Sequence, residues 1–153
     1  MLSEDKMITH KEERRIFERF LQKRQFKNSR KRDLIVDVFL SLHEHMTSED
    51  IYQLVKQKDS SIGYTTVYRT LKLLCESGLC VELKFDDGVT RYEHLYNHPH
   101  HDHLICVECS TCIEFCRPEI EAMQNEIFEK YNFLPHHHKL ELYGVCPKCR
   151  GSK

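Results

Sequence analysis

The sequence predicts an α+β protein in which a mainly helical N-terminal half is followed by a small α/β half. Apolar residues recur at helical spacing through most of the first 85 residues. From residue 98 onward the composition changes, because six of the eight cysteines and seven of the eleven histidines lie there. We therefore expect two domains, 1–95 and 96–153, with a boundary near residues 94–98.

The N-terminal half is expected to contain four helices and a hairpin. Helical spacing indicates helices over about 10–23 and 29–42, a third opening at the capping residue Thr47, and a fourth from Thr65 or Thr66 to a stop at Gly78. The strand-like segments CVELKF and VTRYEHL flank Asp87-Gly88, a two-residue turn signal. Helices two to four followed by a β-hairpin give the order of a winged helix-turn-helix, with the first helix as an extension.

The C-terminal half is expected to mix short strands with one helix. HLICV and CIEF read as strands, PEIEAMQNEIFEKYN as a helix with Pro118 near its start, and HKLELYGVC as an alternating strand.

Composition limits the class of protein. No apolar run approaches the roughly 20 residues of a membrane span, and the N-terminus has no apolar signal core. We therefore expect a cytoplasmic protein with no membrane partner. In a reducing compartment, eight cysteines favour metal ligation over disulfides.

The fourth helix is a candidate DNA-reading element. Val67, Leu71 and Leu74 form an apolar stripe, whereas Tyr68, Arg69 and Lys72 share the opposite face. In a helix-turn-helix the N-terminal residues of the second helix approach base edges in the major groove. A local charge of +7 between Lys11 and Arg32, in a chain of net charge −1, supports double-stranded DNA as the partner. The expected DNA contacts on this helix are Thr65, Thr66, Tyr68 and Arg69.

Two cysteine pairs are the most specific motif in the chain. Cys106-x2-Cys109 and Cys146-x2-Cys149 can together supply four thiolates to a closed structural zinc site. A competing interpretation joins the first pair to Cys112 and Cys116 as an iron–sulfur run, but it leaves the last pair without a role. Under the zinc hypothesis Cys112 and Cys116 are small strand residues or an exposed redox-sensitive pair, and Cys75 and Cys80 are small core residues.

The segment HPHHDHL predicts further metal sites. If residues 100–103 are extended, His100 and Asp102 point to one side and His101 and His103 to the other. Imidazole with carboxylate suits Fe(II), Zn(II) or Mn(II). Candidate partner ligands lie elsewhere in the chain: His45, Glu93, Glu114, Glu121 and His138.

The motifs TTVYRTL, HHDHLICVEC, IEF and LYGVCPKC, in this order, resemble those of the ferric uptake regulator family of bacterial transcription regulators. The resemblance extends over about residues 25–150. It implies a winged-helix DNA-binding domain joined by a hinge to an α/β dimerisation domain. It also implies a homodimer, with a tetramer as an alternative, that binds palindromic operator DNA.

The resemblance also implies residue roles. Structural Zn(II) would be held by Cys106, Cys109, Cys146 and Cys149. A hinge-spanning regulatory site, for Fe(II) with Mn(II) or Zn(II) as substitutes, would use His45, Glu93, His101, His103 and Glu114. An additional site would use His100, Asp102, Glu121 and His138. Lys27 would reach the minor groove, and Tyr68 and Arg69 would act from the recognition helix.

Within this family, peroxide sensors carry Asp where Glu93 stands, so the resemblance favours an iron-sensing repressor of iron-uptake genes. Peroxide-, zinc- and manganese-sensing members are the alternatives, and an iron–sulfur or metal-storage protein is a more distant one. An enzyme is not expected, because the motifs H-E-x-x-H, P-loop and G-x-S-x-G are missing from the sequence.

Overall fold

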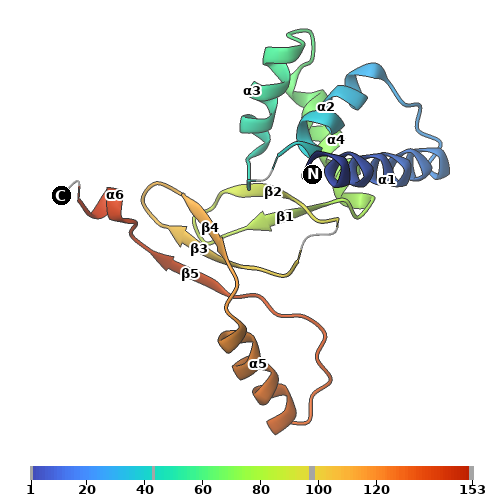
Figure 1. Cartoon of the computed structure of the whole chain (residues 1–153). Helices are drawn as coiled ribbons and strands as arrows, with labels where there is room; N and C mark the ends of the chain where they lie inside the picture. The colour runs from blue at the N-terminus through green and yellow to red at the C-terminus, as the bar shows by residue number, and fades with distance from the viewer. Residues whose placement is uncertain (1, 43, 97–98, 152–153) are drawn as a thin grey trace. The chain divides into compact units, whose positions relative to one another are not determined.

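The structure is a computed structural model that describes residues 2–42, 44–96 and 99–151. It divides into two compact units, Met1–His98 and Pro99–Lys153. The first unit combines four helices with a two-stranded sheet, and the second combines a three-stranded sheet with two helices (Figure 1). The predicted α+β class is therefore confirmed. Among the described residues, no helix is both long and apolar enough to cross a bilayer.

The N-terminal helix α1 (Leu2–Lys23) packs its second half onto the rest of the first unit. It begins eight residues earlier than expected at His10, because residues 2–9 contain no proline or glycine to stop a helix. Phe17 and Leu21 join the core at 3% and 2% exposure. Arg24, just beyond the helix, donates to Glu76 across 2.9 Å. The extension is therefore an integral part of this unit.

Helix α1 also buries a carboxylate. Glu13 is fully buried and forms ion pairs with His10, at 3.1 Å, and with His94. Burial raises the pKa of Glu13, and the neighbouring His10 opposes that shift. The sequence pattern did not indicate the pairing of Glu13 with His94, because these two residues lie far apart in the chain.

Helix α2 (Arg30–Leu40) begins close to the expected residue 29, and helix α3 (Ser48–Lys58) begins at the predicted cap Thr47. Ser29 accepts a hydrogen bond from the backbone N–H of Arg32. Thr47 and Asp50 form a capping box, in which each side chain accepts from the other residue's backbone N–H. Both helices turn apolar residues into the core, which also contains the buried face of helix α4 (Tyr64–Glu76).

The hairpin pairs β1 (Cys80–Lys84) with β2 (Thr90–His94) in antiparallel register. The predicted hairpin is confirmed, but the two-residue turn at Asp87-Gly88 is wrong, because Lys84 pairs with Thr90 and leaves residues 85–89 as the loop. The Asp87 carboxylate shapes this longer loop by accepting from the Val89 N–H at 3.0 Å and from the Arg91 guanidinium at 2.6 Å.

The second unit is built around strand β3 (Asp102–Cys106). It pairs antiparallel with β4 (Cys112–Phe115) on one edge and parallel with β5 (Glu141–Gly144) on the other. Helix α5 (Pro118–Lys130) connects β4 to β5, as expected from the sequence. A short helix α6 (Pro147–Arg150), which was not expected, follows β5.

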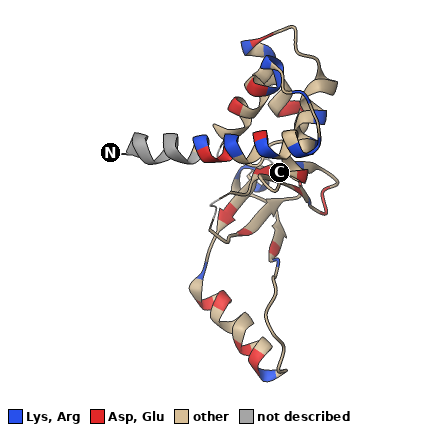
Figure 2. Cartoon of the chain, turned by 90° about the vertical axis from the view of Figure 1, so that its right-hand side faces the viewer, with Lys and Arg blue, Asp and Glu red and all other residues tan. Residues whose placement is uncertain are grey.

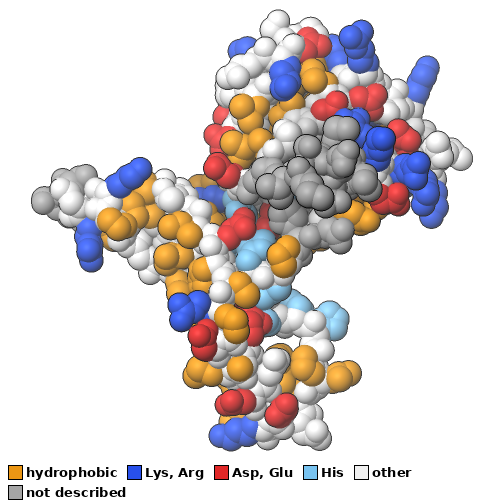
Figure 3. Space-filling view, in the orientation of Figure 1, with side chains coloured by type: hydrophobic (Ala, Val, Ile, Leu, Met, Phe, Trp, Pro, Cys, Tyr) orange, Lys and Arg blue, Asp and Glu red, His pale blue; other side chains and the backbone are white. Residues whose placement is uncertain are grey.

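One face of this second sheet is apolar and exposed. Leu104, Ile113 and Leu142 are register neighbours across the three strands and are 40–53% exposed. Helix α5 buries none of its residues, and Met123 and Ile127 are 64% and 59% exposed. Figure 3 shows hydrophobic side chains gathered over the sheet and helix of this unit. A contiguous apolar surface of this kind is typical of a protein–protein interface.

We expect Leu21→Ala to lower the free energy of unfolding by about 2–5 kcal/mol, because it removes a buried side chain and leaves a cavity. Gln22→Ala, at the next and exposed position, is the matched control and should change little. Denaturant unfolding followed by circular dichroism measures both. Equal stability of the two variants would contradict the packing of α1 onto the core.

Candidate metal centres and nucleic-acid interface

Helix α4 exposes the residues predicted to contact DNA. Val67, Thr70, Leu71 and Leu74 are buried, whereas Thr65, Thr66, Tyr68 and Arg69 are exposed. The helix therefore presents a polar first turn to solvent, as direct readout in a major groove requires.

The predicted cap of α4 is wrong. The N-cap residue is Gly63, which has extended backbone angles and no side-chain cap, rather than Thr65 or Thr66. Helix formation begins one residue before Thr65, so both threonine hydroxyls lie in the first turn and neither is needed as a cap.

The sequence pattern did not predict the aromatic packing next to Tyr68. The Tyr64 and Tyr68 rings stack with centroids 6.2 Å apart, and the Tyr64 hydroxyl lies 2.7 Å from the Ser48 hydroxyl. The signal for Tyr64 was its i, i+4 spacing from Tyr68. Lys72 is not a free member of this face, because its ammonium pairs with Glu82 of β1 and lies over the Tyr68 ring.

Lys27 lies in the exposed connection between α1 and α2. The Arg32 guanidinium donates to the Lys27 carbonyl at 2.7 Å, which fixes the backbone of this connection. Arg30 and Lys31 occupy the first turn of α2, and the Lys31 ammonium donates to the Ser61 carbonyl at 3.3 Å. Figure 2 shows lysine and arginine positions, in blue, repeated along the helices of this unit.

The two cysteine pairs meet in the second unit. Their four Sγ atoms, from Cys106, Cys109, Cys146 and Cys149, all lie within 4.8 Å of one another. The Cys109 and Cys146 sulfurs are 3.7 Å apart. A tetrahedron with Zn–S bonds of about 2.3 Å has an edge of about 3.8 Å, so this geometry fits a four-thiolate zinc site.

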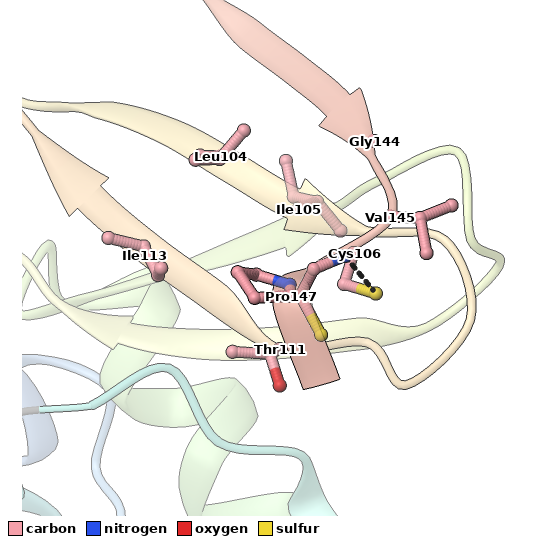
Figure 4. A pocket seen from close by; sticks show the side chains of 9 residues that line it. Leu104, Ile105, Cys106, Thr111, Ile113, Gly144, Val145 and Pro147 are labelled. Atoms are coloured by element: carbon pink, nitrogen blue, oxygen red, sulfur yellow. Dashed lines mark hydrogen bonds between the residues drawn. The ribbon is translucent and has the colours of Figure 1, made fainter. Parts of the chain in front are cut away.

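Backbone N–H groups stabilise the thiolate form of Cys106 in this cluster. The Cys146 N–H donates to the Cys106 sulfur at 3.3 Å, the dashed line in Figure 4. Hydrogen bonds from the backbone of Cys109 and Cys146 lower the pKa of Cys106 to about 6. The thiolate is therefore stabilised before a cation is bound. Leu104, Ile113 and Pro147 line an apolar pocket beside the cluster (Figure 4).

A second donor set combines two imidazoles and two carboxylates. Donor atoms of His100, Asp102, Glu121 and His138 lie within 4.8 Å of one another. Glu121 Oε1 is 3.3 Å from His100 Nε2 and 3.2 Å from His138 Nε2.

Asp102 in this set is 1% exposed, and its Oδ1 lies 3.3 Å from His100 Nε2. Among the described residues, no hydrogen bond to either carboxylate oxygen is formed. Burial of a carboxylate is costly unless a positive charge compensates it. The arrangement therefore fits a divalent cation.

In the first unit, His45 lies beside Glu93. An isolated bridge between Met46 and Tyr92 brings the two segments together, with backbone N–H···O distances of 2.7 and 3.4 Å. The flanking side chains then meet, with His45 Nε2 at 3.4 Å from Glu93 Oε2.

In the second unit, His101 lies beside His103 and Glu114. The two imidazole centroids are 5.0 Å apart, and His101 Nε2 is 3.9 Å from Glu114 Oε1. Glu114 is the register partner of His103 on strand β4. The first unit thus carries a pair of imidazole and carboxylate donors, and the second unit carries a set of three.

Two cysteines of the second unit lie outside these clusters. Cys112 is the first residue of β4, and Cys116 follows the last residue of this strand. Neither cysteine belongs to the four-thiolate group. The iron–sulfur run 106–109–112–116 is therefore not the cluster that the second unit assembles.

The chain is similar to known proteins over most of its length. The model of the family described as "Ferric uptake regulator family" matches residues 23–143. The ferric uptake regulation protein of Campylobacter upsaliensis is 38% identical over 135 residues, 87% of this chain and 86% of that protein. The ferric uptake regulation protein of Bacillus subtilis is 36% identical over 137 residues, 87% of this chain and 91% of that protein.

Solved structures give the same result. The Helicobacter pylori ferric uptake regulator, described as having three functional metal binding sites, matches with a TM-score of 0.80 and 33% identity. The match covers 90% of this chain and 93% of that one. The Francisella tularensis regulator with iron matches with a TM-score of 0.73 and 34% identity, covering 82% and 95%.

We expect Cys146→Ser to abolish retention of zinc through gel filtration in a weak chelator, because three thiolates leave the tetrahedral site open. Unfolding of the second unit should then move to lower temperature, since zinc binding contributes folding free energy. Cys112→Ser, which removes a thiol outside the cluster, is the control. Zinc content measured by mass spectrometry distinguishes the two, and full zinc retention by Cys146→Ser would refute the four-cysteine assignment.

Proposed function

Because the chain belongs to the ferric uptake regulator family, we propose that this metal-responsive, DNA-binding transcription regulator senses Fe(II) and represses iron-uptake genes. The observation that carries the iron assignment is the set of relatives at 34–38% identity that are named ferric uptake regulation proteins. Family members are regulators and not enzymes, so no catalytic residues are assigned.

We assign the four-thiolate cluster to structural Zn(II). Four sulfurs leave no open coordination position, which suits a closed structural site rather than a catalytic one. Bound there, zinc would fasten the turn after β3 to the segment after β5, two parts of the second unit separated by helix α5.

We assign signal reading to His45 and Glu93 of the first unit together with His101, His103 and Glu114 of the second. Imidazole and carboxylate donors suit Fe(II), with Mn(II) or Zn(II) as substitutes. If one ion takes ligands from both units, it favours the arrangement in which both can reach it. His45 and Glu93 would then transmit this preference to the winged helix through the Met46–Tyr92 bridge.

We assign His100, Asp102, Glu121 and His138 to an additional divalent cation. The buried carboxylate of Asp102 supports this assignment. A cation there would join strand β3 to helix α5 and to the loop before β5.

We propose that the assembled form is a homodimer with operator DNA as its partner in the cytoplasm. The exposed apolar row Leu104, Ile113 and Leu142 offers the dimer a surface. Two recognition helices must be spaced by about 34 Å to enter successive major grooves. A metal that restrains each DNA-binding unit would thereby set operator affinity. A tetramer would be an assembly of two such dimers.

We expect the double variant His101→Ala/His103→Ala to lose roughly tenfold or more of its metal-dependent operator affinity, about 1.4 kcal/mol or more. Fluorescence anisotropy with operator DNA, titrated with Fe(II) without oxygen or with Mn(II), measures the change. His136→Ala/His137→Ala, which removes two exposed histidines nearby in sequence, is the control. A double variant that keeps the full metal response would overturn the sensor assignment.

We expect Arg69→Ala to weaken operator binding by about 1–3 kcal/mol and to relax sequence preference, because a base-edge contact is lost.

Lys27→Ala should instead lower the slope of log affinity against log salt by about 1, as for one phosphate contact. Lys130→Ala, in the last turn of α5 in the other unit, serves as the charge-matched control. A salt slope that Lys27→Ala leaves unchanged would remove this lysine from the DNA-contacting set.

A further inference from the structure

A row of three tyrosines joins helix α3 to the exposed face of α4. Tyr52 of α3 meets the Tyr64 ring edge-on, with centroids 5.7 Å apart and planes at 89°. Tyr64 in turn stacks on Tyr68, with centroids 6.2 Å apart and planes at 20°. Tyr52 packs against the core, whereas Tyr64 and Tyr68 are 40% and 39% exposed. The row therefore leads from the core to a side chain predicted to contact DNA.

The Tyr64 side chain is fixed by contacts with α3. Tyr64 is the first residue of α4, and its hydroxyl lies 2.7 Å from the hydroxyl of Ser48, the first residue of α3. The edge-on contact with Tyr52 holds its ring, because aromatic pairs at such spacings attract each other. Tyr64 thus ties together the first turns of the two helices that form the helix-turn-helix.

Tyr68 is confined by the neighbours one helical turn before and after it. Residues 64, 68 and 72 share one face of α4, because side chains four positions apart lie one above the other. The Tyr64 ring stacks on Tyr68, and the Lys72 ammonium lies 5.2 Å from the Tyr68 ring centroid. Lys72 is itself paired with Glu82 of β1. Each of the two confining side chains is therefore anchored to another element.

We propose that Tyr64 is a positioning residue for DNA readout, which holds the Tyr68 ring in the orientation that meets a thymine methyl group in the major groove. This role rests on the proposed function of α4 as the recognition helix. An exposed side chain loses rotamer freedom when it is immobilised at an interface. Because Tyr64 restrains Tyr68 before DNA is bound, part of that entropy loss has already occurred.

The contact that Tyr64 supports depends on orientation. Apolar contact with the C5 methyl of thymine is one of the ways in which a major groove is read. Dispersion attraction falls steeply with distance, so a ring displaced by roughly 0.5–1 Å loses a quarter to a half of it. Loss of Tyr64 should therefore reduce the discrimination of thymine from an analogue without the methyl group.

The experiment uses a duplex obtained by in vitro selection with the Mn(II)-loaded full chain, in which single thymines are then replaced by deoxyuridine. This replacement removes only the C5 methyl group. Fluorescence anisotropy with the unaltered chain is expected to show at least one thymine whose replacement weakens binding by about threefold to fourfold, as for one buried methyl group. Tyr68→Ala should abolish this methyl-dependent loss.

Two variants of Tyr64 separate its ring from its hydroxyl. Tyr64→Leu removes the ring and should reduce the methyl-dependent loss to about twofold or less. Tyr64→Phe is the matched control, which keeps the ring and should keep the methyl dependence. The double variant Tyr64→Leu/Tyr68→Ala should bind no more weakly than Tyr68→Ala, because a positioning residue acts only through the residue that it supports.

A methyl-dependent loss that Tyr64→Leu leaves at its full size would overturn the proposal. In that case a lower unfolding temperature of this variant would show that Tyr64 only stabilises the fold. Additive losses in the double variant would also overturn it, since Tyr64 would then contact DNA independently of Tyr68.

The assignment of Tyr68 fails in a different way. If the unaltered chain shows no methyl-dependent thymine, or if Tyr68→Ala leaves the methyl dependence unchanged, the roles of Tyr68 and Tyr64 are both overturned. A Tyr68→Ala effect without a Tyr64→Leu effect overturns the role of Tyr64 alone.

Discussion

The second unit depends on the pleat of strand β3, which is hydrogen-bonded along both edges. Because β4 and β5 fix this strand on both sides, its alternating side chains are committed to opposite faces. Asp102 is thereby directed to the set with Glu121 and His138, and His103 to the side of its register partner Glu114. Cys106 ends the strand at the four-thiolate cluster. A register slip of one residue would exchange these faces and dismantle every donor set at once.

The first unit follows a different constraint, the burial of one helix face. Val67, Leu71 and Leu74 are fully buried, and this packing leaves the polar face of α4 exposed. Helix α1 adds to the same core through Phe17 and Leu21, and Arg24 ties its end to Glu76 at the end of α4. The basic segment 11–32 is therefore held on a folded body, which reduces the conformational entropy lost when DNA is bound.

Most elements could be predicted because their signals are local. The capping box of Thr47 with Asp50 and the alternation in CVELK need only near neighbours. The errors arose where a longer-range contact overrode the local pattern. Asp87 and Gly88 resemble a tight turn, but the pairing of Asp87 with Arg91 stabilises a longer loop. The cap at Gly63 was missed because two adjacent threonines gave the stronger local signal.

By itself the sequence determined the order of the elements, the spacing of the cysteine pairs and the alternation of donors from His100 to His103, since each depends only on positions along the chain. The tertiary structure alone decided that Glu13 is buried against His94 and that Lys72 pairs with Glu82. Those contacts join side chains from different elements. They form because the fold brings these elements together, and no local residue pattern encodes which elements meet.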